Sequence, residues 1–432
     1  MIKVAVLGGG STYTPELIKG FIDLKNKLPD IEFWLMDVDS WRLKVVGEFT
    51  QRLITAVGDP FKIILTTDRS EAIRGADYII TQLRVGQMAA RREDEYLGKR
   101  NFLIGQETIG IGGMACALRT LPVILEIAKE MRELAPNALM VNFTNPVGII
   151  SEALNRHVPD IQAVGVCNSA YATKMAILEG LEKNNDRTYQ DEDAEILSLG
   201  LNHLTWYFGF RLKGEDVWPE VFERYLKSLE ESALPSFNPG FIRRMGLIPN
   251  HYLGYYYNES RYVHLQDNWP PSRAEEVIAI EAKLLEDYAN PELQTLPQGL
   301  LKRGGAFYAS VATRLINAHY NDLGESHIAN VCHDGMVSGW EREWVLEMPC
   351  KVDHSGIHPL PIKPLPLYNY FLLEQVKQYE IMTIEAAVHG DRYAAIQALM
   401  THPLGPVEEL AEKLLNDLLE TNRSYLPLFF NS

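Results

Sequence analysis

The chain has 432 residues, of which 46% are apolar and 23% charged, and these fractions are close to the average of globular proteins. They exclude a disordered chain, a collagen and a coiled coil, and the length predicts two or three domains at about 100–200 residues each. With 57 acidic and 41 basic side chains the net charge is −16, so the surface repels phosphate backbones and we expect no nucleic-acid partner.

We expect neither a membrane location nor secretion. No apolar run approaches the roughly 18 residues that cross a bilayer, and the apolar start of the chain gives way to glycine too early for a signal peptide. The cysteines are scattered, without C-x-x-C spacing, at Cys116, Cys167, Cys332 and Cys350. Scattered thiols are typical of cytosolic proteins rather than of disulfide frameworks, so the sequence predicts a cytoplasmic protein.

Strand and helix signals alternate through the first third of the chain. Apolar strands are predicted at 4–7, 32–36, 63–65, 78–80, 138–141 and 163–166. Helices are predicted at 14–28, about 41–49, 117–134 and 147–156, with a short one between the third and fourth strands. Buried strands separated by helices are typical of a parallel sheet with helices on both faces. We therefore expect a Rossmann-like, dinucleotide-binding domain over residues 1–195.

The alternation breaks down after about residue 195. Residues 196–212 have the pattern of antiparallel strands, and further strands are predicted near 327–350. Long helices are predicted near 274–289, 299–319, 366–390 and 406–422. We expect residues 196–432 to form a mixed α+β domain that packs against the first, without a clear linker.

A glycine-rich turn follows the first predicted strand and precedes the first helix. Backbone amides at such a turn, together with the positive end of the helix, bind pyrophosphate. The motif is incomplete, because Tyr13 stands where the third glycine of G-x-G-x-x-G is expected. An aspartate at the end of the second strand is placed to accept a hydrogen bond from a ribose hydroxyl. The candidate cofactor-binding residues are therefore Gly8, Gly9, Gly10, Ser11, Thr12 and Asp37.

Other polar residues follow predicted strands, where ligands bind in an open α/β sheet. The segment Asn142-Phe143-Thr144-Asn145-Pro146 offers amides that suit sugar hydroxyls or a nicotinamide, although a capped turn is an equally good interpretation. Cys167 follows the next strand, and His203 lies further along. A thiolate with an imidazole favours a transition metal, but each residue alone is more typical of a buried core.

Two further groups of residues have both a functional and a structural interpretation. The segment Pro249–Tyr257 is rich in tyrosine, which usually serves packing, and a phenol acts as a base only where positive charge lowers its pKa. Arg91, Arg92 and Arg273 suit phosphate oxygens, yet most arginines are solvated surface residues.

Taken together, these residues resemble glycoside hydrolase family 4, the NAD- and metal-dependent glycosidases. The matching motifs run in order along the chain: 8–16 (GGGSTYTPE), 105–108 (GQET), 142–146, 166–168 (VCN), 200–203 (GLNH), 249–257, 272–274 (SRA), 302–305 (KRGG) and 402–406 (HPLGP). Within the family the resemblance is to members that act on 6-phospho-β-glucosides. It implies an α/β fold of lactate/malate dehydrogenase-like architecture, NAD and Mn²⁺ as cofactors, and a homodimer or homotetramer.

The resemblance also implies a role for each matching residue. Cys167 and His203 match metal ligands, Tyr252 the base that abstracts a proton, and Glu107 a position that sharpens the basicity of this tyrosine. Arg91, Asn145, Asn168 and Arg273 match substrate-binding positions, with the arginines serving a 6-phosphate. Members of the α-glucosidase type have Asp where this chain has Asn168, so the implied substrate is β-linked, a phosphorylated disaccharide or β-glucoside, and the acid for the leaving group stays unidentified.

The implied reaction is a hydrolysis that passes through redox chemistry. NAD⁺ oxidises the C3 hydroxyl of the sugar, which makes the C2 proton acidic, and the metal stabilises the enolate as a Lewis acid. Tyr252 removes the C2 proton, the C1 substituent leaves, water adds, and NADH reduces C3 again. Glycosidases normally use two carboxylates, and NAD-dependent enzymes of this kind are an exception.

Three alternatives remain open at this point. An NAD-dependent hydroxy-acid dehydrogenase would share the first domain, and fold alone does not separate the two activities. A family 4 enzyme could instead act on an α-galactoside, an α-glucuronide or a 6-phospho-α-glucoside. A sensor of sugar phosphates would bind without turnover.

Overall fold

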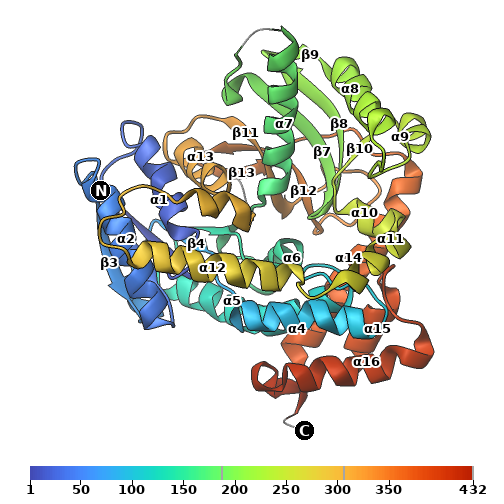
Figure 1. Ribbon diagram of the computed structural model, residues 1–432. Coiled ribbons are helices and arrows are strands. Elements are labelled where there is room, and N and C mark those ends of the chain that lie inside the picture. The colour runs from blue at the N-terminus through green and yellow to red at the C-terminus, as the bar shows by residue number, and fades with distance from the viewer. Residues whose placement is uncertain (186–187, 305–306, 431–432) are drawn as a thin grey trace.

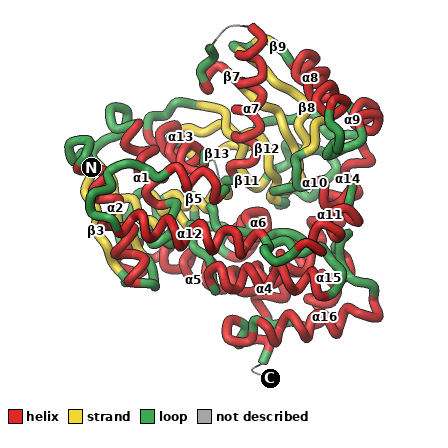
Figure 2. The backbone as a smooth tube through the Cα atoms, viewed as in Figure 1, coloured by secondary structure: helices red, strands yellow, loops and turns green. Residues whose placement is uncertain are grey.

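The strands of the protein join into one sheet with helices on both of its faces. The computed structural model describes residues 1–185, 188–304 and 307–430 (Figure 1). The strand order is β10-β8-β7-β12-β11-β6-β5-β4-β1-β2-β3, with β9 paired to β8 and β13 paired to β12. Figure 2 shows the strands running through the middle of the molecule between groups of helices.

Residues of the first half form a six-stranded parallel sheet of the Rossmann type. Its strands are β1 (Ile2–Leu7), β2 (Ile31–Met36), β3 (Phe61–Thr66), β4 (Tyr78–Thr81), β5 (Leu139–Asn142) and β6 (Gln162–Gly165). The central β1 pairs with β2 on one side and β4 on the other, and its residues Val4 to Val6 are fully buried. The expected Rossmann-like fold of this half is therefore confirmed.

The second half continues the same sheet with antiparallel strands. These are β7 (Ala194–Leu201), β8 (Leu204–Leu212), β9 (Glu215–Asp216), β10 (Ile248–Pro249), β11 (Glu325–Cys332), β12 (Val345–Asp353) and β13 (Gly356–Pro359). β11 joins β6 through the pair Asn330–Gly165, and β12 joins β7 through Glu347–Gly200. The mixed character of this half was predicted correctly, but its strands extend the first sheet, which the sequence did not indicate.

Helices cover both faces of this sheet. In the first half they are α1 (Thr14–Asp23), α2 (Ser40–Thr55), α3 (Arg69–Ile73), α4 (Gln87–Arg100), α5 (Gly110–Leu134), α6 (Val147–His157) and α7 (Asn168–Asn185). In the second half they are α8 (Trp218–Glu231), α9 (Pro239–Met245), α10 (Leu253–Tyr257), α11 (Glu259–Leu265), α12 (Arg273–Ala289), α13 (Tyr308–Tyr320), α14 (Leu367–His389), α15 (Arg392–Thr401) and α16 (Glu408–Thr421). α5, α6 and α14 contact one another, and α13 contacts α1 and α7.

α5 is long and apolar enough to span a bilayer by length and composition, which the search for an apolar run in the sequence missed. Its most apolar 18-residue window is 83% buried inside the protein. The helix packs against α4, α6 and α14, so its apolar surface is accounted for by the core.

Candidate active site

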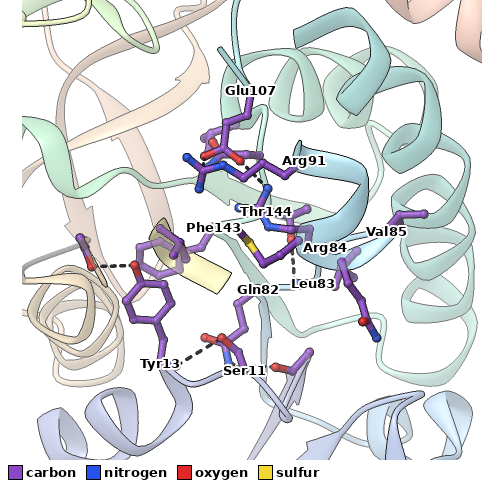
Figure 3. A pocket seen from close by; sticks show the side chains of 18 of the residues that line it. Ser11, Tyr13, Gln82, Leu83, Arg84, Val85, Arg91, Glu107, Phe143 and Thr144 are labelled. Carbon is purple, nitrogen blue, oxygen red and sulfur yellow. Dashed lines mark hydrogen bonds and ion pairs between the residues drawn. The ribbon is translucent and has the colours of Figure 1, made fainter. Parts of the chain in front are cut away.

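A cavity of about 980 Å³ opens at the carboxyl ends of the parallel strands. Residues that follow β1, β2, β4, β5 and β6 line it, together with residues of α4, α12 and the turn between β7 and β8. From β1 the chain continues to β2 on one side of the sheet, and from β4 it continues to β5 on the other side. Open α/β sheets bind ligands at this point, at the carboxyl ends of the strands. Figure 3 shows Glu107 and Arg91 at one end of the cavity and Ser11 and Tyr13 at the other.

Most of the residues singled out in the sequence meet in this cavity. Those that line it are Gly8, Ser11, Asp37, Arg91, Glu107, Asn145, Cys167, Asn168, His203, Tyr252 and Arg273. Gly9, Gly10 and Thr12 are buried behind its wall rather than lining it. Arg92 points elsewhere and pairs with Glu93.

The glycine-rich turn is shaped by close backbone contacts. Gly8 has φ +93°, and a Cβ there would lie 2.8 Å from the backbone of Gln82. Gly8 and Gly9 both donate to the carbonyl of Met36, which ties the turn to the end of β2. A residue with a side chain would be strained and would clash at position 8, so this glycine is required by the close approach of β4.

Asp37 holds the same turn from the other side. Its Oδ2 accepts from the backbone amide of Gly10 at 2.9 Å, and its Oδ1 accepts from the amide of Asp39 at 3.0 Å. A carboxylate has about four acceptor positions, so two are left for a ligand. The position of Asp37 at the end of β2 and in the cavity wall suits the predicted contact with a ribose.

Tyr13, which stands where the third glycine of the motif is expected, packs against the second half of the chain. Its ring stacks on Tyr308 with centroids 5.0 Å apart, and its hydroxyl donates to the carbonyl of Gly304 at 2.6 Å. Tyr308 packs in turn on Phe143, 4.0 Å away. The aromatic residue therefore fixes the second half of the chain against the turn, at the cavity wall.

The turn between β7 and β8 and the end of β6 bring Cys167 and His203 together. The Sγ of Cys167 lies 3.7 Å from Nε2 of His203, whose backbone has φ +69°. Two ligands with metal bonds of ~2.3 Å to sulfur and ~2.0 Å to nitrogen lie about 3.5 Å apart around a tetrahedral ion, so the observed separation is close to that of a pair that shares a metal.

This pair supplies two ligands. No group of three or more His, Cys, Asp or Glu side chains that could hold a metal is found among the described residues. An ion bound here would keep coordination positions open, as catalytic metal sites do.

The tautomer of His203 is set by hydrogen bonds on the side of the ring away from Cys167. The Thr108 hydroxyl donates its hydrogen to Oε1 of Gln106 at 2.8 Å, so the hydroxyl oxygen of Thr108 accepts from Nδ1 of His203 at 3.0 Å. This leaves the lone pair of Nε2 facing Cys167. Burial lowers the pKa of His203 to about 3, so the ring is neutral, as a metal ligand must be. Thr108 did not stand out in the sequence as a partner of His203.

Burial raises the pKa of the Cys167 thiol to about 12, with the charge of Glu347 acting in the same direction. The thiol is therefore protonated at neutral pH without a cation beside it. A bound metal deprotonates a coordinating thiol, so the group becomes a ligand when the ion enters.

Tyr252 lies directly on this pair. Its ring stacks on that of His203 with centroids 3.7 Å apart and 6° between the planes. Burial raises the pKa of the Tyr252 phenol above the ordinary value. The charge of Glu107, and that of Cys167 where it is a thiolate, raise it further, and Arg91 lowers it. A metal ion bound by Cys167 and His203 would supply positive charge beside the phenol and lower its pKa.

Glu107 is the centre of a buried charge network at one end of the cavity. It pairs with Arg84 and, at 3.1 Å, with Arg91. Burial opposes its ionisation, but these guanidinium groups dominate and lower the pKa of Glu107 to about 2. Arg91 also pairs with Glu95 at 3.0 Å. Arg84, which lines the cavity, was not singled out in the sequence because nothing in its local pattern marks it.

The two arginines expected at a phosphate differ in their surroundings. Arg91 is engaged by two carboxylates, whereas Arg273 is half exposed and contacts Glu276 at 2.8 Å and the carbonyls of Lys302 and Arg303. Asn145 lines the cavity, but Asn142 is fully buried and bonds to Thr81 and Thr144, so its role is structural.

The strand order and the glycine-rich turn define an α/β protein of the dinucleotide-binding type. The chain matches the model of family 4 glycosyl hydrolases over residues 3–183 and that of the family 4 glycosyl hydrolase C-terminal domain over residues 198–405. The protein therefore belongs to glycosyl hydrolase family 4, which confirms the resemblance noted in the sequence.

Relatives match over the full length. The probable 6-phospho-β-glucosidase of Bacillus subtilis is 36% identical, with 100% of this chain and 98% of that protein covered. The structure of the 6-phospho-β-glucosidase from Thermotoga maritima with manganese, NAD⁺ and glucose-6-phosphate is 35% identical, covers 98% of this chain and 99% of that one, and has a TM-score of 0.91. Malate dehydrogenase from Plasmodium falciparum has a TM-score of 0.51 at 14% identity, over 90% of this chain and 99% of that one, which confirms the expected architecture alone.

Proposed function

We propose that the protein is an NAD- and Mn²⁺-dependent glycosidase that hydrolyses 6-phospho-β-glucosides. The observation that carries the proposal is that one cavity unites a dinucleotide-type turn, a Cys–His pair and a buried phenol. A hydroxy-acid dehydrogenase needs the first feature but has no use for the other two. The Bacillus subtilis and Thermotoga maritima relatives bear this activity in their names, and the second was solved with both cofactors.

The chemistry follows from the weak acidity of a sugar C–H bond. When bound, NAD⁺ would take the hydride from C3 and the metal would polarise the adjacent sugar oxygens, which makes the C2 proton acidic. The turn at Gly8 and Ser11, with Asp37, would place the nicotinamide toward the sugar. Cys167 and His203 would hold the metal, with Thr108 keeping Nε2 free to bind.

Tyr252 would abstract the C2 proton and return a proton to the same carbon when water has added. Its phenol lies against His203, so the charge that promotes its ionisation is in contact range. Glu107 is held as a carboxylate by its arginines and raises the basicity of Tyr252 through its charge. Asn145 and Asn168 would bind sugar hydroxyls, and Arg273, with Arg91, the 6-phosphate.

The preference for a β-linked substrate depends on position 168. An amide there cannot donate a proton as a carboxylic acid does. Elimination from C1 would then proceed with water or with no protein acid, which suits a substrate that has a good leaving group.

A substrate panel tests the proposal. The 4-nitrophenyl glucosides, β and α, with and without a 6-phosphate, are assayed with NAD⁺ and Mn²⁺ present or withheld. We expect release of nitrophenol from the phosphorylated β-glucoside alone, loss of activity with a chelator, and deuterium at C2 of the product in heavy water. Hydrogen retained at C2 would exclude the elimination route, and steady accumulation of NADH would indicate a dehydrogenase instead.

Three further expectations concern the domain boundary, the oligomeric state and the location of the protein. We expect a boundary between a cofactor domain (1–195) and a substrate domain (196–432), a homodimer or homotetramer, and a cytoplasmic location. The boundary would lie at the start of β7, which begins at Ala194. Limited proteolysis and light scattering would test the first two expectations.

A further inference from the structure

Two aromatic side chains near Tyr252 have no role in the proposed reaction. Tyr255 lies in α10, and its ring centroid is 6.1 Å from that of Tyr252. Trp269 follows the 3-10 turn Gln266–Asn268, and Lys99 donates to its carbonyl at 2.9 Å. Both side chains line the cavity and are only partly buried, so a ligand in the cavity can reach them.

Packing against neighbouring residues fixes both rings. Tyr255 lies with its ring centroid 4.3 Å from that of Tyr262, and it packs on the apolar cluster that contains Ile104. Trp269 lies against the next residue, Gly105, where a Cβ would be 3.0 Å from Cη2 of the indole. Since Ile104 and Gly105 are consecutive, the two rings belong to one wall of the cavity.

The hydroxyl of Tyr255 is available to a ligand. It hydrogen-bonds to no residue in the part of the chain that the structure describes, and it is not among the fully buried polar atoms that lack a partner. Burial raises the pKa of this phenol to about 12. The hydroxyl therefore stays protonated at neutral pH, where it can both donate and accept a hydrogen bond.

The order of atoms in the sugar decides which part of the substrate this wall meets. In the proposed reaction Tyr252 removes the proton from C2, and the leaving group is attached to the neighbouring C1. The glycine-rich turn lies at the end of the cavity opposite Glu107 (Figure 3). Arg273, which is expected at the phosphate, hydrogen-bonds to two backbone carbonyls of the 3-10 turn Gln298–Arg303. The wall beside Tyr252 is therefore left for the group on C1.

We propose that Tyr255 and Trp269 form the binding site for the leaving group of the substrate. The inference rests on the proposed function. A flat aromatic surface binds the apolar face of another ring, so the leaving group accepted here is an aryl ring or a second pyranose. The Tyr255 hydroxyl would bond to a hydroxyl group of the second sugar. Rings that contacted the phosphorylated glucose, or that served stability alone, would instead affect every phosphorylated substrate equally.

The experiment compares three substrates that differ only in the group on C1. They are the methyl and 4-nitrophenyl 6-phospho-β-glucosides and the β-linked disaccharide of glucose with its phosphate on the non-reducing ring, each assayed with NAD⁺ and Mn²⁺. In Trp269→Ala we expect kcat/KM to fall by about 10-fold for the nitrophenyl glucoside and the disaccharide, and to change little for the methyl glucoside. Trp340→Ala is the matched control, because Trp340 is also partly buried but lies outside the cavity, where it donates to Glu374 at 2.9 Å. It should keep the wild-type values for all three substrates.

A second variant keeps the test decisive if Trp269→Ala does not fold. Tyr255→Phe keeps the ring and its packing and loses only the hydroxyl. We expect kcat/KM for the disaccharide to fall by about 3–10-fold, as for the loss of one hydrogen bond, and that for the methyl glucoside to stay unchanged. Tyr257→Phe is its control, because Tyr257 lies in the same helix but does not line the cavity.

A binding measurement separates the leaving group from the sugar. Glucose-6-phosphate carries only a hydroxyl on C1, so its Kd should be the same in wild type, Trp269→Ala and Tyr255→Phe. A higher Kd in the variants, or equal losses of kcat/KM on all three substrates, would overturn the inference and leave the proposed function intact. Unchanged kcat/KM on every substrate in both variants would overturn it as well. Wild-type protein that hydrolyses none of the three would instead contradict the proposed function itself.

Discussion

The hydroxyl of Tyr252 is the group on which the proposed proton transfer depends, and its ring is fixed by stacking on His203. In Tyr252→Phe the ring and its packing stay, but the hydroxyl is lost. Because general acid–base groups contribute about 10²–10⁴-fold, we expect kcat to fall by a factor in this range. Steady-state release of nitrophenol from the phosphorylated β-glucoside would measure it.

The cofactor provides the control for this variant. NAD⁺ affinity, followed by quenching of tryptophan fluorescence, should stay at the wild-type value because Tyr252 lies at the metal pair and not at the glycine-rich turn. If kcat of Tyr252→Phe stayed within a few-fold of the wild-type value, Tyr252 would be excluded as the base.

Glu107 gives a pH dependence with a definite sign. Burial acts against its ionisation, but Arg84 and Arg91 lower its folded-state pKa from the ordinary 4.5 to about 2. A lowered folded pKa stabilises the protein fully above the unfolded value, and this contribution is lost as the pH falls from about 4.5 to 2. We therefore expect Glu107→Gln to be less stable than wild type at neutral pH, with the difference shrinking toward pH 2.

Urea unfolding at a series of pH values would measure this difference. Exposed carboxylates titrate equally in both proteins, so subtracting the two curves isolates position 107. A gap between wild type and Glu107→Gln that stays constant down to pH 2 would contradict the assigned pKa.

Residues of the site were predictable where a local pattern marks them. Gly8 is marked by its neighbours in a turn, and Cys167 by its place after a strand. No local pattern marks Arg84 as a partner of Glu107, and the motif at 105–108 does not reveal that Thr108 bonds to His203, because these partners lie far apart in sequence. Such partners become visible only once the chain is folded.

At the scale of elements, the turn from β1 to α1 is the most constrained connection of the cavity. Gly8→Ala would place a Cβ 2.8 Å from the backbone of Gln82 and keep φ at +93°, which an L-residue adopts only with strain. We expect a loss of about 1–3 kcal/mol in the free energy of unfolding and a higher Kd for NAD⁺.

Gly180→Ala is a suitable control for this variant. This glycine lies in α7, where an added Cβ would meet no atom within 4 Å, so the substitution should leave both quantities unchanged or slightly raise stability. Thermal unfolding and NAD⁺ titration of both variants would show the contrast. Equal effects at the two positions would refute the steric argument.

The strands of the first half were predicted closely because buried parallel strands give continuous apolar runs. β4 and β5 lie within one residue of the expected bounds. Four helix predictions were wrong in length. The first helix ends at Asp23 rather than near 28, α2 continues to Thr55, and α5 begins at Gly110 rather than at 117. Residues 299–319 contain a short 3-10 turn (Gln298–Arg303) before α13 begins at Tyr308. Positive φ at Gly304 and at Phe307 interrupts the helical path, which apolar periodicity alone does not reveal.

Several helices went unpredicted for a different reason. α4 is rich in charge and α8 has a single apolar face, so neither shows the apolar runs by which the other elements were found. α4 nevertheless supplies Arg91 to the cavity. Elements whose sequence is governed by a site or by solvent, rather than by the core, were the hardest to predict.

At the scale of the whole molecule, the sequence did not indicate that the strands of the two halves join into one sheet. β11 and β6 meet through one residue pair, as do β12 and β7, so no long complementary pattern marks either contact. The junction residues Asn330 and Glu347 are polar, and polar residues in a predicted strand indicate a solvent-facing edge rather than a sheet interior. Both are nonetheless 2% exposed or less.

This junction leads to a prediction about unfolding. Domains that meet in one chain usually form modest interfaces and can unfold separately. Here the sheet is continuous, α14 packs on α5 and α6, and α13 packs on α1, so each half covers apolar surface of the other. We expect both halves to unfold in one transition. Hydrogen exchange in increasing urea, read by mass spectrometry, should show peptides of β4 and of β12 losing protection at the same urea concentration. Protection lost in β12 while β4 stays protected would mean that the first half is stable alone, and that its contacts with the second half contribute little to its folding.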